Sequence, residues 1–307
     1  MRPGLRTAVA VALCAAAAAG CGVGPGEDAG EVELSVTRDF GSQALVDERD
    51  SISESDTVLR LLDRNADLET RYGGGFVQSI DGLAGGRADG RASDWFFYVD
   101  GIESPVGGAE YELSDGERVW WDYHDWTSAM RVPAVVGSWP EPFLHGFEGE
   151  RYPAEIRCAR AGEACGTVSD RLEAEGAEVV VPVDEGTQPT GPRAVVLVGT
   201  WARIRTDPDA RLLAEGPERS GVFARLSGDR RALLTLLNQR AEVAGSLGRG
   251  AGLVAALRPG DGPPTWVVTG TDSAGVAAAA GLLGDPLQDR FAVATDGAGE
   301  PIGVPVR

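Results

Sequence analysis

The segment that decides the fold of the first part of the chain is residues 94–101, which read DWFFYVDG. Aromatic and β-branched residues followed by Asp-Gly are typical of a strand that ends in a tight turn. Successive side chains of a strand point to opposite faces, so Trp95 and Phe97 share one face and Phe96 and Tyr98 share the other. The segment therefore predicts a strand that is apolar on both faces.

A second aromatic strand is predicted at residues 117–123, which read ERVWWDY. Trp121 shares one face with the flanking apolar residues, and Trp120 lies on the opposite face. We expect the face of Trp121 to pack on the helix that precedes both strands. Phe96, Tyr98 and Trp120 are then left together on the outer face of a small sheet.

The residues before these strands predict the rest of the first domain. Apolar and polar residues alternate over residues 32–36, as in a half-buried strand. Ser53 and Asp56 fit a capping box, which opens a helix. The apolar side chains of residues 58–62 then fall on one face, and the helix is expected to end near Asn65. The predicted order is strand, second strand, helix and further strands with Asp-Gly turns.

Three strings in this part carry a family resemblance: GFVQSIDGL at residues 75–83, WFFYVDG at residues 95–101 and LSDGERVWW at residues 113–121. They resemble the transcobalamin-like C-terminal domain, a β-grasp-type module of unknown function in many bacterial exported proteins. The resemblance implies an α+β, β-grasp-like domain over residues 31–128. In the cobalamin carriers this domain closes over a corrinoid against a large helical barrel, and no such barrel is predicted here. The resemblance thus implies the fold, while a corrinoid-like ligand does not follow automatically.

Two interpretations of the outer aromatic face remain open. In the first, the second domain covers Phe96, Tyr98 and Trp120. In the second, the three side chains form a stacking platform for a flat ligand, since aromatic faces hold planar groups by dispersion and quadrupole contacts.

Residues 131–307 predict an α/β domain with a mostly parallel sheet. Apolar runs at residues 135–139, 196–201 and 266–272 each contain a Gly near a small hydroxyl residue. Continuous apolar runs are typical of parallel strands that are buried on both faces. The first two runs open stretches that continue alike, each with a helix and a closing strand, which suggests an internal duplication.

The elements of this domain follow from apolar spacing. The two helices of the duplication are placed around Val168 and Leu172 and around Leu233, Leu236 and Leu237, with closing strands at residues 179–183 and 253–257. The third run leads into a helix at residues 273–283, and a last strand is predicted at residues 291–295.

The carboxyl ends of these strands are the predicted ligand pocket of the second domain. In open α/β sheets, ligands bind beyond these ends, where helix N-termini offer free N–H groups. The residues concerned are Gly199, Thr200, Gly270, Thr271 and Asp272, and Thr271 or Asp272 is expected to cap the following helix. The alternative is that each Gly serves only a tight turn, since the sequence shows neither a dinucleotide fingerprint nor a P-loop.

The N-terminus reads as an export signal. A short positive region precedes an apolar run at residues 7–19, which is too short to span a membrane. The small residues before Cys21 resemble the lipobox of bacterial lipoproteins, although Ala18 stands where Leu is usual. We expect residues 1–20 to be removed, Cys21 to carry lipid and residues 21–30 to form a flexible tether. The alternative is an ordinary secretory signal that is cut nearby.

Two of the remaining cysteines are predicted to form a disulfide. Cys14 leaves with the signal, so the mature folded chain keeps Cys158 and Cys165. An exported compartment permits disulfides, and two cysteines separated by a short loop are most simply bridged. A metal or redox pair has less support, because the spacing is not Cys-x-x-Cys.

Charge and composition limit the function. The formal net charge of −19 argues against a nucleic-acid partner, because nucleic acids are themselves polyanions. No serine lies in a nucleophile-elbow sequence, and no catalytic residue, metal site or cofactor is predicted. His124 beside Asp125 is expected to be a structural, hydrogen-bonded histidine.

The predicted function is therefore that of a binding protein. We expect a lipid anchor to hold it at the extracytoplasmic face of the cell membrane, where the domain interface binds a small, corrinoid-like ligand for a membrane transporter. The alternative is a cell-surface structural or protein-interaction module without a small ligand. An extracytoplasmic enzyme has the least support.

Overall fold

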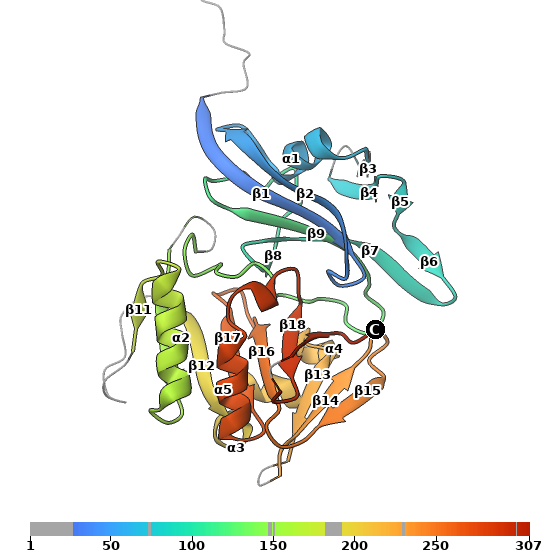
Figure 1. Ribbon diagram of the computed structural model, residues 1–307. Coiled ribbons are helices and arrows are strands. Elements are labelled where there is room, and N and C mark those ends of the chain that lie inside the picture. Colours follow the sequence, from blue (N-terminus) through green and yellow to red (C-terminus); the bar gives the residue numbers. More distant parts are fainter. Residues whose placement is uncertain are drawn as a thin grey trace, which may run out of the picture.

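Strands β1 (Asp28–Arg38) and β2 (Gln43–Ser53) form a long antiparallel hairpin at the start of the folded chain (Figure 1). Val32, Leu34 and Val36 of β1 are buried, as the alternation of this segment predicts. β1 begins inside the segment that was expected to be a tether, residues 21–30. The tether prediction is therefore too long, because backbone pairing with β2 already orders the chain at Asp28.

The computed structural model describes a defined part of the chain, namely residues 27–72, 75–146, 149, 151–181, 192–228, 231–298 and 300–307. The predicted signal peptide of residues 1–20 and the predicted lipidation site Cys21 lie outside the described residues. Within the described ranges, no helix is both long and apolar enough to cross a bilayer.

The N-terminal sheet has the strand order β2-β1-β9-β7-β6. The two predicted aromatic strands are β7 and β9, which pair antiparallel, and β9 pairs in parallel with β1. Two short strands, β6 and β8, pair with the other edge of β7. The bounds are β6 (Gly86–Ala88), β7 (Arg91–Val99), β8 (Ile102–Glu103) and β9 (Arg118–Asp125), and a separate small sheet holds β3 (Leu68–Arg71), β4 (Phe76–Ile80) and β5 (Leu83–Ala84).

Helix α1 (Val58–Asn65) packs on one face of the N-terminal sheet and buries its predicted apolar side chains. It begins later than the capping box predicts. The N–H of Arg60 donates to Oγ1 of Thr57 over 3.3 Å, so Thr57 is the N-cap. Asp56 accepts a hydrogen bond from the N–H of Ser53 over 2.9 Å and closes the turn before the helix. Ser53 therefore does not cap α1.

The C-terminal domain is built on a seven-stranded mixed sheet of order β11-β10-β12-β17-β16-β18-β19. Its strands are β10 (Ala154–Cys158), β11 (Val179–Val180), β12 (Ala194–Thr200), β16 (Gly252–Leu257), β17 (Thr265–Gly270), β18 (Ala292–Thr295) and β19 (Pro301–Val304). Strands β11, β10, β12 and β17 run parallel, whereas β16, β18 and β19 pair antiparallel. The prediction of a mostly parallel sheet is thus wrong for half of the strand pairs. The connection between β16 and β17 is too short for a crossover, so these strands form a hairpin.

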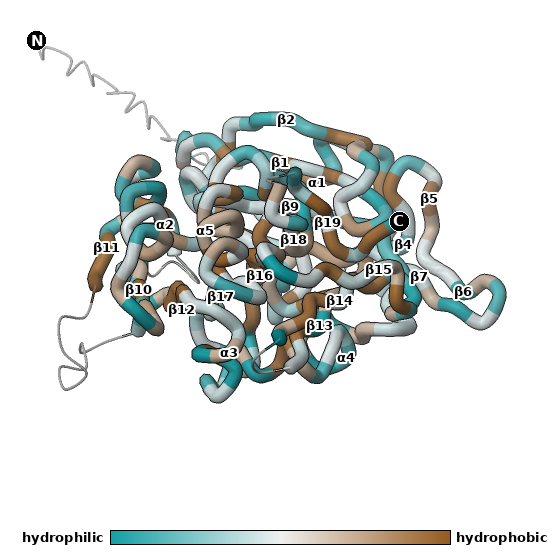
Figure 2. The backbone as a smooth tube through the Cα atoms, turned by 60° about the horizontal axis from the view of Figure 1, so that its bottom comes forward, coloured by the Kyte–Doolittle hydropathy of each residue, from teal (hydrophilic) through white to brown (hydrophobic). Residues whose placement is uncertain are grey.

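Both faces of this sheet are covered. Helices α2 (Glu163–Ala174) and α5 (Ser273–Gly281) lie side by side on one face (Figure 1). The opposite face carries the short helices and a three-stranded antiparallel sheet, namely α3 (Trp201–Ile204), η2 (Ala210–Ala214), α4 (Pro217–Ser220), β13 (Ala224–Ser227), β14 (Leu233–Leu237) and β15 (Val243–Leu247). A last short helix, η3 (Asp285–Leu287), precedes β18. Burial on both faces explains the continuous apolar runs of β12, β16 and β17. Figure 2 shows hydrophobic segments concentrated inside the molecule and a hydrophilic turn beyond β6.

Two predicted elements of this domain are wrong. Residues 135–139 form turns and not a strand, because they attach the domain to the β7–β8 hairpin through the N–H of Val135, which donates to the carbonyl of Gly101 over 2.8 Å. Residues 233–237 form strand β14 and not a helix, since turns at both ends leave too few residues for one. The suggested duplication therefore does not exist, because its second helix is replaced by a sheet.

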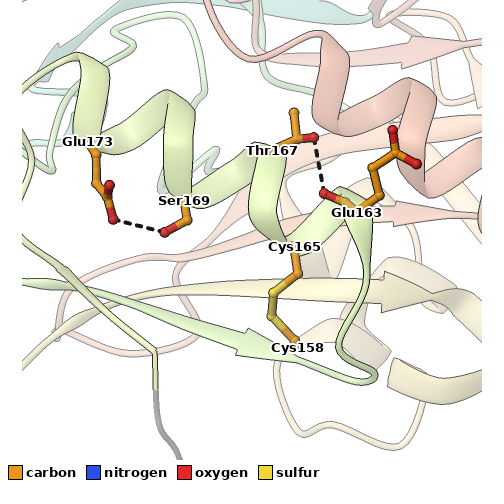
Figure 3. Close-up of a disulfide and its surroundings, with 6 residues drawn as sticks. All are labelled: Cys158, Glu163, Cys165, Thr167, Ser169 and Glu173. Carbon is orange, nitrogen blue, oxygen red and sulfur yellow. Dashed lines mark hydrogen bonds between the residues drawn. A yellow bond between two sulfur atoms is a disulfide. The ribbon is translucent and has the colours of Figure 1, made fainter.

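The predicted disulfide between Cys158 and Cys165 is confirmed. Cys158 ends β10 and Cys165 lies in the first turn of α2, with 6.2 Å between their Cα atoms (Figure 3). The bridge fixes the start of α2 to the sheet on which the helix packs.

Candidate functional site

The outer aromatic face of the N-terminal sheet is closed by the C-terminal domain. Tyr98 and Trp120 are 1% and 0% exposed. The ring of Phe291 lies 5.2 Å from that of Trp120 and 5.7 Å from that of Tyr98, and Phe223 belongs to the same cluster. Of the two interpretations left open by the sequence, covering by the second domain is the one observed. A stacking platform open to a ligand is not formed by these two rings.

Phe96, the third predicted platform residue, is half-buried beside this cluster. Its ring stacks on the imidazole of His124, with 4.5 Å between centroids and 20° between planes. His124 is itself buried and also contacts Phe40 and Phe291. The junction is thus filled by rings from both parts of the molecule.

A buried carboxylate orders the polar groups of the junction. Oδ2 of Asp122 lies 2.9 Å from Nδ1 of His124. Asp122 also accepts hydrogen bonds from Oγ1 of Thr37 over 2.5 Å and from the backbone N–H groups of Phe40 and Gly41 over 3.1 and 2.8 Å. The partner of His124 is therefore Asp122 and not the neighbouring Asp125. The carboxylate oxygens of Asp122 already accept hydrogen bonds from groups of the protein. We therefore infer that the Asp122–His124 pair has a structural role.

The predicted pocket residues of the C-terminal domain lie together at the carboxyl ends of β12 and β17. Register pairing places Thr200 opposite Gly270. A Cβ at Gly270 would lie 2.4 Å from the backbone of α5, so this glycine is required for the helix to pack on the sheet. A Cβ at Gly199 would likewise lie 2.6 Å from the side chain of Ala159. These two glycines serve close packing.

Thr271 and Asp272 form hydrogen bonds with backbone groups of α5 and of the loop before β16. Oδ1 of Asp272 accepts from the N–H of Gly275 over 3.0 Å, which confirms Asp272 as the N-cap of α5. Oγ1 of Thr271 donates to the carbonyl of Gly248 over 2.7 Å. Ligand binding by this set stays a prediction, and the side chains of Thr271 and Asp272 already have intramolecular hydrogen bonds.

A cleft of about 810 Å³ opens where the two parts of the molecule meet. The N-terminal part contributes the turn between β1 and β2 and the adjoining ends of β7 and β9. The C-terminal part contributes the turn between β14 and β15 and the last residues of the chain. The lining residues are Asp39, Ser42, Gln43, Arg91, Ser93, Tyr123, His124, Asp125, Asn238, Gln239, Arg240, Val306 and Arg307.

Arginines give the cleft its hydrogen-bonding character. Arg91 forms an ion pair with Asp125 and reaches the carbonyl of Gln239 across the junction over 3.4 Å. Burial opposes ionisation of Asp125, but hydrogen bonds from Thr127 and Arg91 outweigh it and lower the pKa of this carboxyl. The exposed guanidinium of Arg240 has no ion-pair or hydrogen-bond partner in the described part of the chain. Arg240 is therefore free to bind a carbonyl, carboxylate or phosphate oxygen.

Among the residues that line the cleft, the sequence drew attention only to His124 and the neighbouring Asp125, and as structural residues. The lining residues come from five separate segments with no shared motif, and the topology alone brings them together. The polar turn Asn238-Gln239-Arg240 after an apolar run was the one signal of a surface loop. Among the described residues, no group of three His, Cys, Asp or Glu side chains is placed to hold a metal ion.

The family model of DUF4430, a domain of unknown function, matches residues 55–125. This DUF4430 region lies within the part whose sequence resembles the transcobalamin-like domain. No curated protein matches the chain.

Two solved structures are similar to part of the chain. Haptocorrin in complex with Cbi is 12% identical, with a TM-score of 0.26, over 32% of this chain and 26% of that one. A candidate metal-binding protein from Ruminococcus gnavus ATCC 29149 is 16% identical, with a TM-score of 0.25, over 31% of this chain and 97% of that one. The alignment thus spans about a quarter of haptocorrin, and both likenesses cover only about a third of this chain.

Proposed function

We propose that this protein binds a small ligand in the cleft between its two parts, outside the cytoplasm and held to the membrane by lipid on Cys21. The observation that carries the proposal is the cleft itself, which both parts line with hydrogen-bonding side chains. Its volume of about 810 Å³ lies within the range of small-molecule sites, roughly 300–1,000 Å³. In this proposal the protein acts by binding and not by catalysis.

The lining favours a ligand with several polar groups at its edge. Asp39 and Asp125 bring negative charge, and Arg91, Arg240 and Arg307 bring positive charge, so neither sign dominates. A corrinoid-like ring carries peripheral amides that both donate and accept hydrogen bonds, and such a ligand is our finer proposal. It rests on the three sequence strings that resemble the transcobalamin-like domain. Transfer of the ligand to a membrane transporter is part of the same proposal.

We also propose that the N-terminal part is a β-grasp-type domain. The hairpin β1–β2, helix α1 and the antiparallel pair β7–β9 follow one another along the chain. The parallel pairing of β1 with β9 at the centre of the sheet supports this arrangement.

The second candidate function is a protein-interaction or structural module. The closed aromatic junction favours this second function, because Tyr98 and Trp120 pack the two parts together and are not available to a small ligand. A protein of this kind would bind no small molecule in the cleft.

Calorimetric titration with cobinamide and cobalamin, using the chain from Gly22 onward, tests the proposal. We expect saturable binding that Arg240→Ala weakens by about tenfold or more, since it removes a charge-assisted hydrogen bond. Arg203→Ala is the matched control, because Arg203 is exposed on α3 and does not line the cleft. Equal weakening by both substitutions would exclude the cleft as the site. No heat with either corrinoid would remove the finer ligand proposal and leave the interaction module ahead.

A further inference from the structure

The imidazole of His124 has one ring nitrogen that the structural pair does not use. Nδ1 faces Asp122, whereas Nε2 makes no hydrogen bond to any of the described residues. Nε2 is also not sealed from solvent, unlike the unpaired hydroxyl of Tyr98 in the same junction. His124 as a whole is only 3% exposed, and it lines the cleft between the two parts. The structural role of His124 therefore accounts for Nδ1 and leaves Nε2 unexplained.

The groups packed around the imidazole direct Nε2 toward the cleft. β9 lies between β1 and β7, so Phe40, which follows β1, and Phe96 of β7 approach the ring from opposite sides. Their centroids lie 4.6 and 4.5 Å from that of the imidazole, with 31° and 20° between planes, so they cover its two faces. Nδ1 is turned toward Asp122, which is farther from the end of β9. Nε2, on the other side of the ring, therefore points toward the end of the strand, where the cleft opens.

Asp122 determines which nitrogen of the neutral imidazole carries the proton. A carboxylate accepts hydrogen bonds and donates none, so Nδ1 is the donor of this pair. The neutral ring then has an unprotonated Nε2, which accepts a hydrogen bond and cannot donate one. The N–H groups of Phe40 and Gly41 hold the carboxylate in place over 3.1 and 2.8 Å. His124 thus presents a fixed acceptor to the cleft.

The charges near Nε2 favour a neutral donor over an anionic group. Asp94 of β7 lies in register with His124. Asp39, whose N–H donates to the carbonyl of Tyr123 over 2.8 Å, lines the cleft beside the end of β9. Carboxylates at these positions repel a carboxylate or phosphate of a ligand. On the C-terminal side of the cleft, Arg240 requires an acceptor such as a carbonyl oxygen. A neutral carboxamide offers both an N–H donor and a carbonyl acceptor.

Given the proposed binding of a ligand in the cleft, on which this step rests, we propose that Nε2 of His124 accepts a hydrogen bond from a carboxamide N–H of that ligand. The ligand class is then a neutral molecule with carboxamide groups, and His124 is the residue that distinguishes it from the corresponding ester. An ester offers only acceptors, so it leaves Nε2 without a partner. A buried acceptor that loses its partner lowers affinity.

Nuclear magnetic resonance of the imidazoles tests the proposal, because the chain has two histidines. The signals of His124 are assigned by their loss in His124→Asn. At pH 8 we expect Nε2 of His124 to be unprotonated. Nicotinamide and methyl nicotinate are the matched probes, since both are neutral and planar and only the amide donates. We expect nicotinamide to shift the Cε1–H signal of His124 in a saturable manner and to bind fivefold to tenfold more tightly than the ester. The signal of His145, which does not line the cleft, should not move.

Two substitutions of His124 separate ligand contact from a purely structural role. His124→Asn keeps an N–H donor near the position of Nδ1, toward Asp122, and removes the acceptor. His124→Gln places an amide oxygen near the position of Nε2 and removes the donor to Asp122. We expect His124→Asn to lose the preference for the amide and His124→Gln to retain part of it. His145→Asn is the control and should bind as the unmodified protein does. If neither His124 variant folds, the two probes on the unmodified protein still decide.

Titration of the same variants with cobinamide distinguishes this step from the proposed function. Cobinamide binding that Arg240→Ala weakens and His124→Asn leaves unchanged would support the cleft as the site and overturn the role of His124. A preference for the amide at His124 without cobinamide binding would support that role and remove the corrinoid ligand. A protonated Nε2, equal affinity for amide and ester, or a His124 signal that neither probe moves would each overturn the proposal.

Discussion

Asp100 is a buried carboxyl group that makes the stability of this fold depend on pH. It occupies the turn after β7 with φ of 51°, is 4% exposed and accepts a hydrogen bond from the N–H of Arg118 over 2.9 Å. Burial, and then the nearby carboxylate of Glu141, raise the pKa of Asp100 well above its usual range. The folded protein therefore favours the neutral form of this side chain. Its contribution to stability is complete below the pKa of the unfolded chain, about 4, and is lost as pH rises through the folded pKa.

We expect Asp100→Asn to raise the free energy of unfolding at pH 7.5 by on the order of 1 kcal/mol, because the amide keeps the acceptor oxygen and removes the buried charge. Asparagine also tolerates the positive φ. Urea unfolding at several pH values measures the effect, and the gain should vanish below pH 4. Asp89→Asn is the control, since Asp89 has φ of 52° but is exposed. A gain that is equal at all pH values would show that the charge is not its cause.

Among the elements, those with a strong local pattern were predicted correctly. Local patterns predict these elements without distant contacts. They are the apolar-polar alternation of β1, the apolar face of α1 and the continuous apolar runs of β12 and β17. The strand β14 was missed because a five-residue apolar run fits both a helix face and a strand, and only its pairing with β13 and β15 decides. Residues 135–139 are apolar because they are buried between the two parts, which sequence alone does not separate from strand formation.

The disulfide joins β10 to the start of α2 and closes a loop with a sequence separation of 7. We expect the double variant Cys158→Ser, Cys165→Ser to lose about 2.5 kcal/mol of stability, chiefly because the unfolded chain gains freedom. Urea unfolding of both proteins gives the value. Adding a reductant should lower the stability of the native protein to that of the variant and leave the variant unchanged. Equal unfolding midpoints of the oxidised protein and the variant would show that the bridge does not stabilise the fold.

At the scale of the molecule, the aromatic junction packs the two parts against each other, and we expect them to unfold together. Phe291 of the C-terminal domain contacts the rings of Phe40, Tyr98 and Trp120 from the N-terminal part. We expect Phe291→Ala to cost about 3–5 kcal/mol and to destabilise both parts together, because it leaves a cavity between them. Circular dichroism and tryptophan fluorescence should then report one coincident transition at lower denaturant. Leu45→Ala, at an exposed position of β2, is the control. An unchanged fluorescence transition in Phe291→Ala would contradict the coupling.

The junction also explains how much of the candidate site the sequence could predict. The alternation of side chains along β7 and β9 correctly placed Phe96, Tyr98 and Trp120 on the same face of the sheet, because alternation is a local property of a strand. Whether that group faces solvent or a second domain depends on the packing of Phe223 and Phe291, which no local pattern encodes. The cleft beside it is formed by turns and chain ends that meet only in the folded molecule.

The parallel pairing of β1 with β9 has a consequence for the time course of folding. Glu33 of β1 lies in register with Arg118 of β9, so the chain between them must be complete before the central pair of the sheet can form. Contacts this distant in sequence form slowly, because loop closure precedes any gain from pairing. A chain that is synthesised from its N-terminus therefore presents the inner edge of β1 unpaired until β9 follows. An open strand edge is prone to pair with other chains. The interval before β9 is available is therefore the stage at which the β1–β2 hairpin is most exposed to pairing with other chains.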